Sequence, residues 1–251
     1  MGRRVLFCCK TELRYNALGD PECGRHDLVF VGSRGEPVVW DLDTVVELVA
    51  VVGSNLLFAA PVWELARRGR ACEVLTGLAL AVTSTLYHVC DTARVEILSM
   101  NAGNWHRLDN VFTILSFGSL GPLLMGRAAT QAQVDGFRAA VLVFGLFFQE
   151  LNPWSLPCML APVCAASVLY AAWAATYAAR GHHRRRLATR EFWWACGVQV
   201  VSLACFARGL DHQNGRDPRR LFHGAWHALN ALAATLFVRA LDQSAAAAKQ
   251  S

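Results

Sequence analysis

Five residues of this chain have side chains that can together bind a metal ion and move a proton. Ser84 and His88 are four residues apart, Asp109 follows at the start of a later apolar segment, and His223 and His227 are again four apart. Residues four apart lie on one face of a helix, so each pair is predicted to point one way. All five lie in apolar surroundings, where polar and ionisable groups are costly and usually serve a function.

Three imidazoles are the protein ligands of a zinc site that keeps one coordination position open. We expect neutral His88, His223 and His227 to bind Zn²⁺, with water in the fourth position, where the metal lowers its pKa toward neutrality. Asp109 would orient and deprotonate this water, and Ser84 would donate a hydrogen bond to the developing oxyanion. These residues predict a hydrolase that acts on an ester or amide at a membrane surface.

Each of these residues also has a simpler structural interpretation. Asp109 is of a type that often caps the N-terminus of a helix, and Ser84 of a type that often hydrogen-bonds a backbone carbonyl of its own helix. Two histidines four residues apart occur often by chance, so His223 and His227 alone are weak evidence. The third imidazole, His88, at a matching depth strengthens the metal interpretation.

The composition indicates a membrane as the surrounding medium. The chain of 251 residues is 54% hydrophobic and 17% charged, whereas soluble domains carry about a quarter charged residues. Most arginines stand at the edges of apolar segments, which is typical of membrane orientation and contact with lipid headgroups. No aromatic-interleaved basic face accompanies them, so we expect no nucleic-acid partner.

Seven segments are long and apolar enough to cross, or nearly cross, a bilayer core of about 30 Å. The sequence therefore predicts an all-α integral membrane protein, a seven-transmembrane helical bundle within residues 37–242. Residues 1–36 are expected to form a polar, irregular N-terminal tail, and residues 243–251 a disordered C-terminal tail. The predicted crossings are 42–65, 72–90, 108–126, 136–151, 155–178, 191–209 and 220–241.

The odd number of predicted crossings and the arginine counts of the loops together predict how the protein is oriented in the membrane. With seven crossings, all five candidate residues fall on the side of the membrane that holds the N-terminus. The loops between segments contain five arginines on that side and nine on the other. The positive-inside rule then predicts an exoplasmic N-terminus and a cytosolic C-terminus, in the plasma membrane or in the endoplasmic reticulum or Golgi. The sequence leaves the oligomeric state open.

At these residues the chain resembles a superfamily of seven-helix membrane proteins. It comprises alkaline ceramidases, progestin and adiponectin receptors, the Per1 proteins of GPI-anchor remodelling and the TMEM8/myomaker family. Members share S-x-x-x-H in helix 2, an Asp at helix 3 and H-x-x-x-H in helix 7, which stand here as Ser84-x-x-x-His88, Asp109 and His223-x-x-x-His227. The string from Ser84 to Asp91 is most similar to the TMEM8/myomaker family. The resemblance, which covers about residues 40–240, implies zinc-dependent hydrolysis of a membrane lipid, either ceramidase-like or phospholipase A2-like.

The resemblance also raises the possibility of a second cation. Asp41, Asp43 and Glu47 begin the first apolar segment, and alkaline ceramidases hold Ca²⁺ with acidic residues near this point. A simpler explanation is that acidic side chains are favoured at the N-terminus of a helix, and we prefer it.

Two other classes of function remain open. A receptor or a protein of membrane fusion and remodelling would use the same ligands for a structural zinc and would catalyse nothing. A transporter would need polar residues along several helices at the membrane midplane. The predicted fourth and fifth crossings have almost none, so a transporter is the least favoured class.

Overall fold

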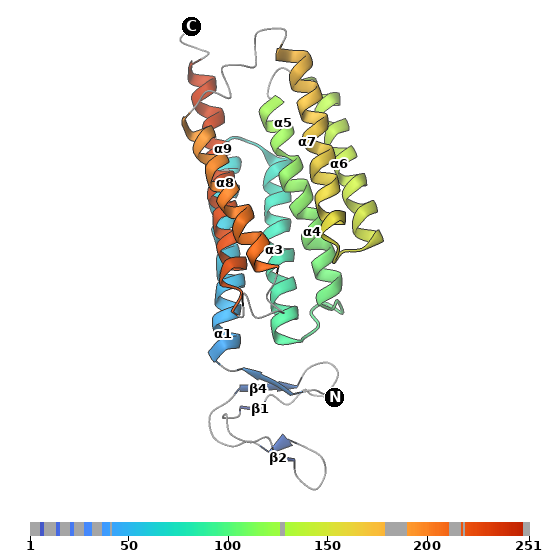
Figure 1. Ribbon diagram of the computed structural model, residues 1–251, viewed down its shortest axis with the longest axis vertical. Coiled ribbons are helices and arrows are strands. Elements are labelled where there is room, and N and C mark those ends of the chain that lie inside the picture. Colours follow the sequence, from blue (N-terminus) through green and yellow to red (C-terminus); the bar gives the residue numbers. More distant parts are fainter. Residues whose placement is uncertain are drawn as a thin grey trace.

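The helices of the computed structural model lie side by side along a common axis and form an elongated bundle (Figure 1). The structure describes residues 42–125, 129–178, 190–210, 217 and 219–247, and five short strands before them. The first apolar segment is a continuous helical run of 25 residues from Leu42 to Ala66. It consists of α1 (Leu42–Leu48), the π-helical segment η1 (Val49–Gly53), the 3-10 helix η2 (Leu56–Phe58) and α2 (Ala59–Ala66).

The remaining helices follow the predicted segments closely. Within the described residues, each predicted crossing coincides with one helix or with a run of consecutive helices. These are α3 (Ala71–Ala93), α4 (Ala102–Gly118), α5 (Leu120–Met125), α6 (Gln131–Leu151), α7 (Leu156–Ala178), α8 (Arg190–Gly209) and α9 (Leu221–Ala247).

The boundary of α4 differs from the prediction, which began the third segment at residue 108. The Asn101 side chain accepts a hydrogen bond from the Asn104 amide at 3.0 Å and caps the helix, so α4 starts at Ala102. Apolar content alone missed this start because the first turns of α4 are polar. Asp109 therefore lies two turns inside the helix, and its interpretation as an N-cap is wrong.

Short strands lie within residues 1–36, which the sequence predicted to be irregular, and a further strand follows directly at residues 37–40. Strands β4 and β5 pair in antiparallel fashion, with Val31 opposite Pro37, and β1 pairs with β4. Both runs are rich in valine, which favours extended structure. The strands are β1 (Leu6–Phe7), β2 (Arg14–Tyr15), β3 (Pro21–Glu22), β4 (Leu28–Val31) and β5 (Pro37–Trp40).

Four helices among the described residues are long and apolar enough to cross a membrane, and they fit an integral membrane protein. Helices α6 and α8 are not among them, but both expose large apolar side chains. Val143 and Phe147 on α6 and Val200 on α8 have exposed fractions of 65%, 58% and 67%. The four candidate spans are Leu42–Ala66, Ala71–Ala93, Leu156–Trp173 and Leu221–Leu241.

Ion pairs lie where α2 ends and α3 begins, at the end of the bundle opposite the start of α1 (Figure 1). The Glu64 carboxylate is 2.7 Å from the Arg68 guanidinium and 2.9 Å from that of Arg239 on α9. Glu73 pairs with Arg138 of α6. Both glutamates are buried, and the arginines compensate the cost of removing their charge from water.

Candidate metal centre

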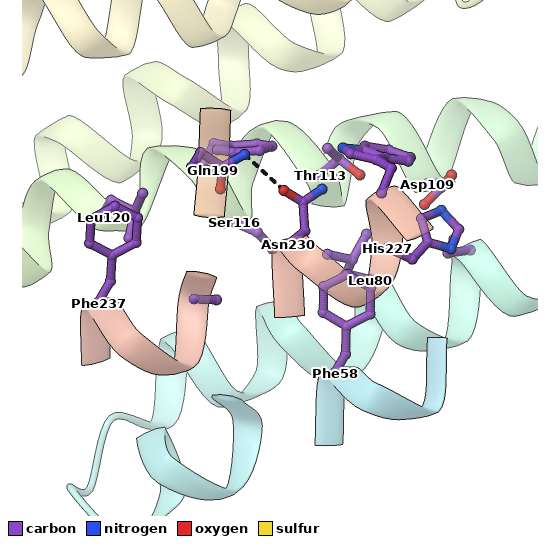
Figure 2. A pocket seen from close by; sticks show the side chains of 14 residues that line it. Phe58, Leu80, Asp109, Thr113, Ser116, Leu120, Gln199, His227, Asn230 and Phe237 are labelled. Atoms are coloured by element: carbon purple, nitrogen blue, oxygen red, sulfur yellow. Dashed lines mark hydrogen bonds between the residues drawn. The ribbon is translucent and has the colours of Figure 1, made fainter. Parts of the chain in front are cut away.

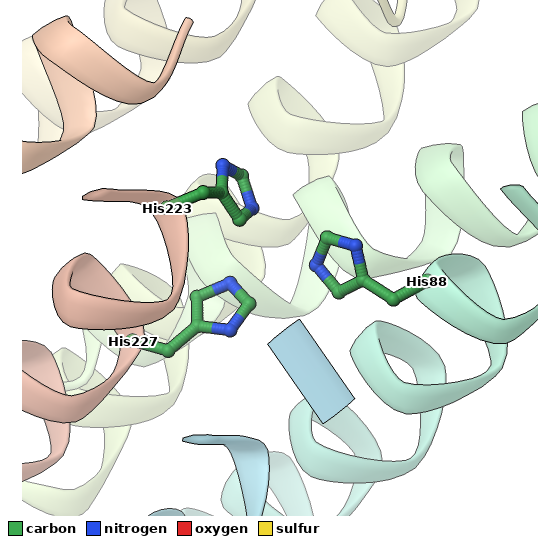
Figure 3. Close-up of side chains that lie close together, drawn as sticks. All are labelled: His88, His223 and His227. Carbon is green, nitrogen blue, oxygen red and sulfur yellow. The ribbon is translucent and has the colours of Figure 1, made fainter. Parts of the chain in front are cut away.

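Three histidines from two distant parts of the sequence meet at the end of the bundle where α1 begins. His88 lies near the end of α3, and His223 and His227 lie on the first two turns of α9. One ligand atom of each ring lies within 4.8 Å of the others. Figure 3 shows the three rings converging on one point. Within the described residues, no other group of three or more His, Cys, Asp or Glu side chains is arranged to hold a metal ion.

The donors fit a zinc ion in type and in number. Tetrahedral zinc with Zn–N bonds of about 2.0–2.1 Å needs nitrogens roughly 3.3 Å apart. The imidazoles therefore have to close by up to about 1.5 Å, which small side-chain rotations supply. His88 is fully buried, and its Nε2 has no hydrogen-bond partner among the described residues. A buried nitrogen of this kind needs an explanation, and a metal ion shared with the other two rings provides one.

A hydroxyl group on η1's C-terminal side fixes the orientation of the His227 ring. Ser54 Oγ donates to the Val51 carbonyl at 3.0 Å and lies 3.2 Å from His227 Nδ1. A hydroxyl has one proton, so Ser54 accepts from the Nδ1–H of His227. This leaves the lone pair of His227 on Nε2, where a metal ligand needs it, and it is the usual support for a metal-binding histidine.

Arg220 joins three elements around the other side of the triad. Its guanidinium pairs with Asp91 at the end of α3, its Nε lies 3.2 Å from Glu47 of α1, and its Nη1 lies 3.4 Å from His88 Nδ1. Burial lowers the pKa of this guanidinium, but the Asp91 carboxylate and then Tyr87 and Glu47 raise it, and the net direction is upward. Arg220 thus remains charged and ties α1, α3 and the start of α9 together.

Asp217 fixes the backbone that carries His223. Its carboxylate accepts hydrogen bonds from the amides of Phe222 at 3.2 Å and His223 at 3.1 Å, which are free donors in the first turn of α9. Asp217 is itself buried. Sequence reasoning missed this residue, although an Asp shortly before an apolar helix is a recognisable capping signal.

Asp109 and Ser84 lie together beside the triad, both buried. Ser84 Oγ accepts from Asn55 Nδ2 at 3.1 Å, and the Ser84 side chain hydrogen-bonds the Asp109 carboxylate. Asn55, Ser84 and Asp109 therefore form a chain of hydrogen bonds that crosses from the first helical run through α3 to α4. Ser84 therefore hydrogen-bonds side chains from other helices, whereas the simpler interpretation expected a bond to a backbone carbonyl of its own helix.

The residues proposed for a second cation do not form a comparable cluster. Asp41 lies outside the described residues. Asp43 pairs with Arg219 at 3.0 Å, and Glu47 pairs with Arg220 at 3.2 Å. Both carboxylates are compensated by arginine side chains, so a calcium ion stays a prediction without added support.

A largely apolar pocket leads from the triad into the bundle (Figure 2). Ser84, Asp109 and His227 line it together with aromatic and aliphatic side chains. An apolar lining with a few polar groups is typical of ligand sites. The lining therefore suits part of a lipid chain next to the candidate metal site. Its deeper lining includes Phe58, Leu80, Phe117, Leu120, Ala234 and Phe237.

Comparison with known proteins places the chain in a family. No curated protein matches it. A family model described as "Protein of unknown function (DUF3522)" matches residues 43–228, a range that contains every histidine of the triad and covers most of the chain. The chain belongs to this family of proteins of unknown function.

Proposed function

We propose that this protein is a zinc-dependent membrane hydrolase that cleaves a lipid amide or ester. The observation that carries the proposal is the convergence of His88, His223 and His227 beside an apolar pocket that His227 and Asp109 both line. The three imidazoles would hold zinc through one nitrogen each. Zinc bound there would supply Lewis acidity, which polarises a carbonyl and makes water easier to deprotonate for attack on that carbonyl.

We assign the proton transfer to Asp109, which lines the pocket together with His227. Its carboxylate would take a proton from the attacking water as the new C–O bond forms. It would then return this proton to the leaving nitrogen or oxygen as the old bond breaks. Ser84 donates to the Asp109 carboxylate and accepts from Asn55. Once Asp109 is protonated, the Ser84 proton is released from this bond and becomes available to a developing oxyanion.

The membrane setting supports a lipid substrate. Four candidate spans and the apolar outer faces of α6 and α8 favour seven crossings, as the predicted bundle requires. Arginine counts favour an exoplasmic triad. The resemblance to the TMEM8/myomaker family supports a ceramidase-like or phospholipase A2-like reaction. A receptor or fusion role with structural zinc is the alternative outcome of the experiment below.

Metal content and lipid turnover test the proposal together. The purified chain is expected to hold about one zinc ion, measured by inductively coupled plasma mass spectrometry, and to lose it in His223→Ala combined with His227→Ala. His106→Ala is the matched control, because His106 stacks on Trp154 at 4.0 Å and belongs to no metal group among the described residues. Unchanged zinc in the double variant would refute the metal centre.

Lipidomics then separates catalysis from a structural metal. Membranes containing the wild-type protein are expected to accumulate a free fatty acid and its partner product, whereas membranes with His223→Ala are not. A wild type that holds zinc but leaves every lipid unchanged relative to His223→Ala would support the receptor or fusion role.

A further inference from the structure

Four polar side chains cross the apolar pocket beyond the triad, and we call them the polar belt. Thr113 and Ser116 come from α4, Gln199 from α8 and Asn230 from α9, and all four line the pocket. Figure 2 shows the Asn230 amide between Gln199 and Thr113. Polar groups are costly within a membrane bundle and usually serve function. The catalytic proposal above gives none of these four a task.

The polar belt lies one to two helical turns deeper than the reacting groups. Asn230 is three residues beyond His227 on α9, which is about 4.5 Å at 1.5 Å per residue. Thr113 is four residues beyond Asp109 on the same face of α4, or about 6 Å. A chain of C–C bonds of about 1.5 Å covers this distance in roughly three to four bonds. The belt is thus within reach of an atom close to the reacting carbonyl.

Hydrogen bonds within the polar belt determine which of its polar atoms remain available to bind a ligand. Asn230 Oδ1 accepts from Gln199 Nε2 at 2.8 Å and from Ser202 Oγ at 2.9 Å. A carbonyl oxygen has two lone pairs, so its capacity is filled. Ser202 is fully buried, and its hydroxyl also lies 3.2 Å from the Trp226 carbonyl, so its one proton has two acceptors, of which Asn230 Oδ1 is the nearer.

The belt therefore offers the pocket both donors and acceptors. Among the described residues, none accepts from the Asn230 Nδ2 amide or donates to Gln199 Oε1. The Ser116 hydroxyl is buried without a partner in that part of the chain. Among the described residues, no Lys or Arg lines the pocket, which argues against a phosphate at this depth. A neutral group that both donates and accepts a hydrogen bond fits best, and a hydroxyl is the simplest such group.

We propose that the polar belt binds a hydroxyl group of the lipid substrate whose oxygen lies about three to four bonds from the carbonyl carbon that reacts. This proposal rests on the proposed function for the position of that carbonyl. It makes Asn230 and Thr113 specificity-determining residues. The hydroxyl has two possible sources, the acyl chain or the amine side of the lipid, and the experiment distinguishes them.

Binding is measured with three probes on the full chain in lipid nanodiscs, after removal of metal with a chelator so that no probe is cleaved. The parent probe is N-palmitoyl-propylamine. The second carries a hydroxyl on the third acyl carbon, and the third carries one on the second amine carbon. Each competes with radiolabelled parent. At least one hydroxylated probe is expected to bind about 2- to 10-fold more tightly than the parent, the worth of one neutral hydrogen bond.

Asn230→Leu and the nearly isosteric Thr113→Val are expected to reduce this preference, and Asn230→Leu to abolish it. Phe237→Leu is the matched control, because Phe237 lies in the same pocket on the same face of α9 and should weaken all three probes equally. Equal affinities for all probes in the wild type overturn the proposal, as does a preference that survives both polar variants. Thr113→Val keeps the test valid if Asn230→Leu fails to fold.

The two proposals fail separately. Metal-loaded samples of the same preparations are assayed for cleavage of the three probes and of a palmitoyl ester. Cleavage without any preference for a hydroxyl refutes the polar belt alone. A preference without cleavage supports the belt as a ligand subsite and refutes the hydrolase.

Discussion

The roles of single side chains around the triad follow from how few hydrogen-bond positions they have. His227 uses Nδ1 on Ser54 and so keeps the lone pair of Nε2 for a metal ion. Arg220 can only donate, so its 3.4 Å contact with His88 Nδ1 favours a proton on His88 Nε2, and metal binding at Nε2 requires that this contact is released. Asp109, by contrast, has its hydrogen bond with Ser84 and lies on the pocket wall. In the proposed function, this difference distinguishes the histidines, which would hold the metal, from Asp109, which would move a proton.

Asp109→Asn is expected to abolish hydrolysis while leaving zinc in place. The amide keeps the shape of the side chain but has no basic carboxylate, and loss of a general base costs about 10²–10⁴-fold in rate. The measurement is turnover of the substrate identified by lipidomics, with zinc content and thermal midpoint followed in parallel. Ser84→Ala should show a milder loss of about 10²–10³-fold. Loss of zinc in Asp109→Asn would instead make this residue a ligand.

Ser54→Ala is expected to weaken zinc binding without unfolding the protein. The variant removes the acceptor for His227 Nδ1–H, and loss of such a support commonly costs about 10–100-fold in metal affinity. Zinc affinity is measured by competition with a chromogenic chelator. Ser167→Ala is a matched control, because Ser167 also bonds a carbonyl of its own helix, at 2.9 Å, but lies away from the triad. Equal affinities in both variants would exclude a role for Ser54.

At the scale of helices, the close approach of α9 to η1 is what brings the triad together. A Cβ atom on Gly224 would lie 2.6 Å from the Ala50 carbonyl oxygen and 3.0 Å from its carbon. Both are backbone atoms and cannot rotate away. The π-helical turn of η1 displaces its backbone locally, and such turns are frequent at functional sites. Glycine at position 224 allows α9 to lie against this turn with His223 and His227 on either side of the contact.

Gly224→Ala is therefore expected to lower both thermal stability and zinc content. Alanine normally stabilises a helix interior by about 1 kcal/mol relative to glycine, and here the backbone clash outweighs that gain. Gly197→Ala on α8 is the control, because its Cβ would meet nothing within 4 Å. The control should be as stable as the wild type or more so. A Gly224→Ala protein with normal zinc content would show that this contact does not position the triad.

Sequence patterns predicted the helices and the triad because both depend on local spacing. His88, His223 and His227 were found from repeats of four and from the parity of the segments. Ser54, Arg220 and Asn230 were not given roles, since their roles depend on which side chain faces them from another helix. The start of α4 was placed too late for a related reason: its cap, Asn101, precedes a polar turn that an apolar count excludes.

The whole molecule places the start of α1 and the end of α9 at opposite ends of the bundle (Figure 1). This fits an odd number of crossings, and the arginine counts then predict that the N-terminus is exoplasmic and the C-terminus cytosolic. A glycosylation acceptor inserted into the N-terminal tail is expected to be modified in cells, whereas one placed after Asp242 is not. Gel mobility before and after glycosidase treatment gives the result. The reverse pattern would turn the triad toward the cytosol.

The ion pairs at the two ends of the bundle also define its hydrophobic thickness. Along α3, Glu73 and Asp91 are 91 − 73 = 18 residues apart, or about 27 Å. Arg220, just before α9, pairs with Asp91, and Arg239 on α9 pairs with Glu64. These two arginines are 239 − 220 = 19 residues apart, or about 28 Å along the helix. Two helices thus give the same length independently, and a tilt reduces it slightly.

This length matches the endoplasmic reticulum bilayer, with a core of about 27 Å, better than the plasma membrane at about 32–33 Å. In a thicker bilayer the charged layers would be drawn into hydrocarbon, or the lipid would have to thin around the protein. The thermal midpoint should therefore be highest in short-chain phosphatidylcholine bilayers and fall as the acyl chains lengthen. A midpoint that rises with chain length would contradict this. The spacing between the two layers of ion pairs thus predicts that the protein is more stable in a thin bilayer than in a thick one.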